Sequence, residues 1–107
     1  MGEQCRFCVI NQSLAEKAPG LVNKSGKLLV EALGRMPLEQ YGGLTINGGM
    51  TARPGRGMEK IVPVVREVSA RFPNLQIAVE ITPPADLGWI DALAGAGAAS
   101  LMMNLEV

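Results

Sequence analysis

The chain has 107 residues, of which 48% are hydrophobic and 19% charged, and its ten basic residues balance ten acidic ones. This composition favours one folded domain over residues 1–107 and gives no support for disorder, a membrane surface or a nucleic-acid partner. The N-terminus lacks a signal-peptide pattern and no apolar run is long enough to cross a bilayer, so we expect a cytoplasmic protein.

The first motif along the chain is Cys5-Arg6-Phe7-Cys8, which contains the only two cysteines. This spacing lets one loop give two thiolates to a single metal centre or close a disulfide. A zinc site is disfavoured because the chain has no histidine and no third cysteine. A thioredoxin-like dithiol would need a preceding strand, and two ordinary thiols in an N-terminal tail are a further alternative. The absence of distant cysteine partners indicates a reducing compartment.

A helix is predicted over residues 27–35, followed by a strand over residues 43–47. The strand leads into Gly48 and Gly49, which either form a tight turn or let the backbone approach a ligand closely. The next loop carries Arg53 and Arg56, which suit a carboxylate or a phosphate. Its sequence matches neither the Walker pattern nor the dinucleotide-binding glycine pattern.

Residues 58–72 show an amphipathic helical pattern that predicts a helix covering a sheet. Pro63 removes a backbone donor and crowds the preceding turn, so the pattern predicts that regular helix begins near Lys60. Pro73 then ends it. The apolar positions of this pattern are Met58, Ile61, Val62, Val65, Val68 and Phe72.

The second strand is predicted over residues 75–81, and it contains Glu80, which faces either a site or an exposed edge because burying it alone is costly. Asp86 is the expected N-cap of a shorter helix that Gly95 and Gly97 interrupt. The third strand is predicted over residues 99–105. Asn104 and Glu106 lie two positions apart at its end and therefore point the same way, as an ordinary polar strand end or as acceptors for ribose hydroxyls or an amino group.

Helices that alternate with strands in this way predict an α/β fold with right-handed crossovers and a parallel sheet, either doubly wound or part of a barrel. In both architectures the ligand site lies at the carboxyl ends of the strands.

In this order, the motifs resemble the radical S-adenosylmethionine superfamily, and most closely its biotin synthase and lipoyl synthase branch. Cys5, Phe7 and Cys8 match the second half of the family's C-x3-C-x2-C loop, while Met1 stands where the first family cysteine would be. Gly48-Gly49-Met50 is similar to the family's Gly-Gly-Glu segment without the acid. Asn104-Leu105-Glu106 is similar to the end of the family's fourth strand.

The resemblance implies a partial (β/α) barrel of the TIM-like type, with about three αβ units after the cysteine loop. It implies a 4Fe-4S cluster held at Cys5 and Cys8, and S-adenosylmethionine contacted by residues drawn from Phe7, Gly48, Gly49, Glu80, Asn104 and Glu106. Intact relatives cleave this cofactor reductively to a 5'-deoxyadenosyl radical and act on a small-molecule substrate. With two cluster cysteines, this chain alone is expected to be inactive.

Two alternatives remain open. The chain is a non-catalytic remnant or interaction module that self-associates through open sheet edges, or it is a cytosolic dithiol redox protein that uses Cys5 and Cys8.

Overall fold

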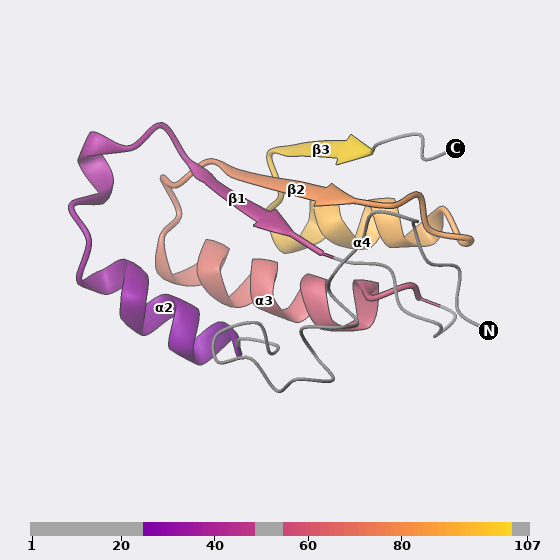
Figure 1. Cartoon of the computed structure of the whole chain (residues 1–107), viewed down its shortest axis with the longest axis horizontal. Coiled ribbons are helices and arrows are strands. Elements are labelled where there is room, and N and C mark those ends of the chain that lie inside the picture. Colours follow the sequence, from indigo (N-terminus) through magenta and orange to yellow (C-terminus); the bar gives the residue numbers. More distant parts are fainter. Residues whose placement is uncertain (1–24, 49–54, 104–107) are drawn as a thin grey trace, which may run out of the picture.

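The computed structural model describes residues 25–48 and 55–103, in which helices and strands alternate along the chain (Figure 1). The elements, in chain order, are α2 (Gly26–Gly34), the short 3-10 helix η1 (Leu38–Gln40), β1 (Leu44–Asn47), α3 (Met58–Arg71), β2 (Ile77–Ile81), α4 (Gly88–Ala96) and β3 (Ser100–Met103). The predicted order of helix, strand, helix, strand, helix, strand is confirmed.

The three strands form one parallel sheet in the order β1-β2-β3, so each strand pairs with the next strand along the chain. The register places Asn47 opposite Glu80, and Glu80 opposite Met102. The expected α/β fold with a parallel sheet is therefore confirmed for the part of the chain that the structure describes.

Helices α2, α3 and α4 cover the same face of the sheet (Figure 1). Helix α3 lies in the middle and packs against both α2 and α4. The core between these helices and the sheet is apolar, as the spacing of hydrophobic residues in α3 predicted. Its buried members are Leu33, Met58, Ile61, Val62, Val65, Val68, Ile77, Val79, Ile81, Leu93 and Ala96.

The opposite face of the sheet, called the open face below, is formed by the alternate positions of the strands. In β2, Ile77, Val79 and Ile81 are buried under the helices, whereas Ala78 and Glu80 between them are only half-buried. The same alternation operates in the two neighbouring strands. The open face therefore consists of Thr45, Asn47, Ala78, Glu80, Ser100 and Met102.

Helix α3 begins at Met58, so the prediction that it begins near Lys60 is wrong. Pro63 lies in the second turn, where its ring removes one intrahelical hydrogen bond but does not prevent the first turn from forming. That first turn is closed by the Lys60 and Ile61 amides, which both donate to the Gly57 carbonyl at 3.0 and 3.2 Å. Pro63 itself is exposed.

The start and the end of α4 agree only in part with the sequence prediction. The N-cap position is occupied by Leu87, so the prediction that Asp86 is the N-cap is wrong by one residue. Asp86 nevertheless accepts a hydrogen bond from the amide of Gly88, the first helical residue, through Oδ1 at 2.8 Å. Gly95 does not interrupt the helix, which continues to Ala96. Gly97 ends it with φ of 109°, a left-handed conformation that glycine adopts without steric cost.

The strands are shorter than the apolar runs that predicted them, because β2 begins at Ile77 rather than at residue 75, and β1 begins at Leu44. Strand β3 is described from Ser100 to Met103. Within the described ranges, no helix has both the length and the apolar character needed to cross a membrane.

Candidate functional site

The carboxyl ends of the parallel strands gather polar groups at one edge of the sheet, where the sequence predicted a site. Asn47 is the last residue of β1, and Glu80 lies directly across from it on β2. Both side chains belong to the open face, away from the helices. The topology thus brings together residues that are 33 positions apart in the sequence.

Asn47 and Glu80 are hydrogen-bonded through their side chains, with Asn47 Nδ2 donating to Glu80 Oε2 at 3.2 Å. Asn47 is exposed and Glu80 is half-buried. A carboxylate can only accept hydrogen bonds, so this contact fixes which atom of the Asn47 amide faces Glu80. The amide oxygen Oδ1 therefore points away from the carboxylate.

Gly48 continues the edge by one residue, and its backbone amide donates to the Glu80 carbonyl at 3.0 Å. A β-carbon at this position would collide with Cδ1 of Ile61 and lie 3.9 Å from Cγ2 of Ile81. A side chain at this position would therefore displace the end of the Ile61 side chain, and the glycine lets the sheet edge pack closely against α3. Sequence interpretation offered a tight turn or a ligand approach, and it did not include this packing reason.

Arg56 joins the loop before α3 to the loop after β2, because its Nη1 donates to the carbonyl oxygen of Pro83 at 3.4 Å. Its backbone φ of 51° lies in the left-handed region, which arginine seldom adopts. The adjacent Gly55 is packed beneath Glu59 and Trp89 and is buried. The turn that carries Arg56 thus contacts the loop after β2 and lies beside side chains of α3 and α4.

Several residues predicted for the site lie outside the described ranges. These are Cys5, Phe7, Cys8, Gly49, Asn104 and Glu106. Of the predicted cofactor-binding set, the structure describes Gly48 and Glu80 and brings them together at one edge. Among residues 25–48 and 55–103, no group of three or more His, Cys, Asp or Glu side chains could hold a metal ion.

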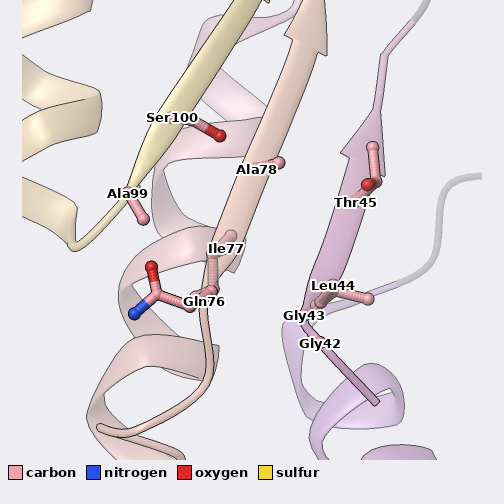
Figure 2. A pocket seen from close by; sticks show the side chains of 9 residues that line it. All are labelled: Gly42, Gly43, Leu44, Thr45, Gln76, Ile77, Ala78, Ala99 and Ser100. Atoms are coloured by element: carbon pink, nitrogen blue, oxygen red, sulfur yellow. The ribbon is translucent and has the colours of Figure 1, made fainter.

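A shallow depression occurs at the opposite, amino-terminal end of the strands (Figure 2). Thr45 and Ser100 supply hydroxyl groups to it, and no ionisable side chain lines it. A reaction centre needs acids, bases or metal ligands, so this depression is a weaker candidate than the carboxyl edge. Its lining residues are Gly42, Gly43, Leu44, Thr45, Gln76, Ile77, Ala78, Ala99 and Ser100.

Sequence reasoning did not single out Asn47, although a signal for it was present. Asn47 follows Thr45 at a spacing of two in an otherwise apolar strand, which places both polar side chains on the same face. What the sequence lacked was the register between β1 and β2, which sets Asn47 beside Glu80.

Comparison with known proteins gave no significant match to a family model, a curated protein or a solved structure.

Proposed function

We propose that this chain supplies the S-adenosylmethionine-binding edge of a radical S-adenosylmethionine barrel. The observation that carries the proposal is the arrangement of the sheet, in which consecutive parallel strands have the described helices α2, α3 and α4 on one face (Figure 1). A barrel repeats this arrangement, because its strands follow one another in sequence order, its helices lie outside and the other face of its sheet is turned inward. On this proposal the open face is the inner wall of the barrel.

The polar groups at the carboxyl edge support the same proposal. Asn47 and Glu80 lie on the open face near the carboxyl ends of β1 and β2, and barrel enzymes have their active sites at this end of the strands. A carboxylate and an amide suit the hydroxyl and ammonium groups of S-adenosylmethionine. From the resemblance, Gly49, Asn104 and Glu106 would complete the binding edge.

The iron-sulfur cluster fits the chain only in part. Cys5 and Cys8 would provide two thiolates. A 4Fe-4S cluster in which one iron is left free to bind S-adenosylmethionine needs three thiolates for its other irons. When such a cluster is complete, it supplies the electron that cleaves the sulfonium. The residues of this chain bind and orient the cofactor, and a further thiolate is required before any reductive chemistry can follow.

Titration calorimetry of the full chain with S-adenosylmethionine, combined with amide NMR of a 15N-labelled sample, tests the proposal. We expect saturable binding, with the largest shifts at Asn47, Gly48 and Glu80. Amides at the amino-terminal depression, such as those of Gln76 and Ser100, should move little and serve as internal controls. Absence of saturable binding, or shifts concentrated at Gln76 and Ser100, would contradict it.

A further inference from the structure

The large hydrophobic side chains that are exposed in the described part of the chain gather at the two ends of the sheet. The first end is formed by α2 and β1 and the second end by α4 and β3, with α3 and β2 between them (Figure 1). None of these exposed side chains belongs to α3 or β2. A single exposed hydrophobic residue is ordinary, but a concentration of them at both ends marks two surfaces suited to a protein partner. At the first end they are Leu28, Met36 and Tyr41, and at the second end Leu87, Met102 and Met103.

The two ends also carry the edge strands of the described sheet, because β1 and β3 each pair only with β2 in it. An edge strand is a template on which another strand can pair. The two ends match in length, since β1 and β3 have four residues each and α2 and α4 have nine each. A second copy can therefore set its β1 beside β3 as a parallel strand and its α2 beside α4. This placement repeats the way in which β1 lies beside β2 and α2 beside α3 within one chain.

The distribution of charge favours the joining of unlike ends. Residues 82–103, at the second end, contain the exposed acids Asp86 and Asp91 and no basic residue. The first end carries basic residues as well, and its exposed charged side chains are Lys27, Glu31, Arg35 and Glu39. Contact between two second ends would bring only acidic groups together, whereas contact with a first end offers them basic partners. Lys27 and Asp91 lie in the first turns of α2 and α4, so parallel helices set side by side bring them to a similar level.

We propose that copies of this chain associate head to tail, with the first end of one copy against the second end of another. The inference goes beyond the proposed function and does not depend on it. The pairing of β1 with β3 extends the parallel sheet across the two copies. It also places Leu28 of one copy and Met103 of the other in the contact, and removal of such side chains from water drives the association. The contact uses different surfaces on the two copies and is therefore heterologous.

Sedimentation equilibrium of the full chain over a range of concentrations tests the proposal. We expect the average mass to rise above the 11.3 kDa of one chain as the concentration increases. Leu28→Asp blocks the first end and Met103→Asp blocks the second end, so each variant alone should keep the mass of one chain. Ala70→Asp, a matched change at an exposed position of α3, should associate as the wild type does. A wild-type chain that remains at the mass of one chain, or an end-blocked variant that associates as the wild type does, would overturn the proposal.

A mixture of the two end-blocked variants tests the head-to-tail arrangement itself. Each variant retains one intact end, and the two intact ends are the complementary ones. An equimolar mixture of Leu28→Asp and Met103→Asp should therefore form a pair with the mass of two chains. A mixture that stays at the mass of one chain would overturn the arrangement. Circular dichroism and urea unfolding establish that each variant is folded.

A charge exchange tests the placement of α2 beside α4 at exposed positions, where the fold tolerates substitution. Lys27→Glu and Asp91→Lys should each weaken the association about fivefold, because each sets like charges against each other. The double variant Lys27→Glu with Asp91→Lys restores opposite charges across the contact and should associate as the wild type does. Weakening that the double variant does not reverse would overturn the placement of the two helices.

Discussion

Replacing Gly48 with alanine tests whether this glycine serves packing or ligand binding. A new β-carbon would collide with Cδ1 of Ile61, a buried side chain of α3. Inserting a methyl group into a filled core costs about 1–3 kcal/mol of unfolding free energy. Gly48 lacks a positive φ, so alanine meets no backbone strain there.

The double variant Gly48→Ala with Ile61→Val separates the collision from other effects. Ile61→Val alone should cost about 1 kcal/mol, because it removes the same Cδ1 methyl group. In that background the alanine methyl group fills the space left by Cδ1, and alanine also restricts the unfolded chain by about 0.4–1 kcal/mol relative to glycine. We therefore expect the double variant to be more stable than the sum of the single changes predicts, by at least about 1 kcal/mol.

Urea unfolding of the wild-type chain, the two single variants and the double variant measures this coupling between positions 48 and 61. Gly34→Ala combined with Ile61→Val is the control, because a β-carbon at Gly34 meets no atom within 4 Å and the two changes should add. Additive costs for Gly48→Ala and Ile61→Val would refute the packing explanation. The Gly48 amide already donates to the Glu80 backbone carbonyl, so it is not available to bind a ligand. We therefore also expect the double variant to bind S-adenosylmethionine within about threefold of the wild-type affinity.

Three further predictions concern the end of α4, its start and the cysteine loop. Gly97→Ala should destabilise the protein by about 1–3 kcal/mol in urea unfolding, because Gly97 has a φ of 109° and a new β-carbon would collide with Ser69. Gly95→Ala should instead stabilise the protein by about 0.5–1 kcal/mol, because Gly95 lies inside the helix and a β-carbon there meets no atom within 4 Å. Equal effects at the two glycines would show this explanation to be wrong. Asp86→Ala should cost about 1 kcal/mol and Asp86→Asn much less, since asparagine retains an acceptor for the Gly88 amide. A cost for asparagine as large as that for alanine would speak against a stabilising role of this hydrogen bond. Anaerobic reconstitution with iron and sulfide should give no stable 4Fe-4S cluster, as measured by iron analysis and EPR, because two thiolates leave one ligand position to be filled; a stoichiometric cluster that responds to S-adenosylmethionine would contradict this.

The sequence predicted the element order and the parallel sheet because apolar spacing and turn residues are local signals. It could not predict the start of α3, since the effect of Pro63 depends on its place within the helix and on exposure. It singled out Glu80 because burying an unpaired carboxylate is costly. It could not identify Asn47 as the partner of Glu80, because that contact depends on the register between β1 and β2, which no local pattern encodes. The close packing that favours glycine at position 48 likewise depends on a contact with Ile61 in the following helix, which the local sequence does not show.

The consecutive order of the strands means that the molecule is built almost as a one-dimensional stack of helix-strand units. In the described part of the chain, the main contacts of each unit are with the units before and after it in sequence, so its stability depends chiefly on nearest neighbours, as in repeat proteins. The unit of α3 and β2 has neighbours on both sides and holds the fully buried residues Val65, Val68, Ile77 and Val79. We therefore expect the outer units to unfold before the central unit of α3 and β2.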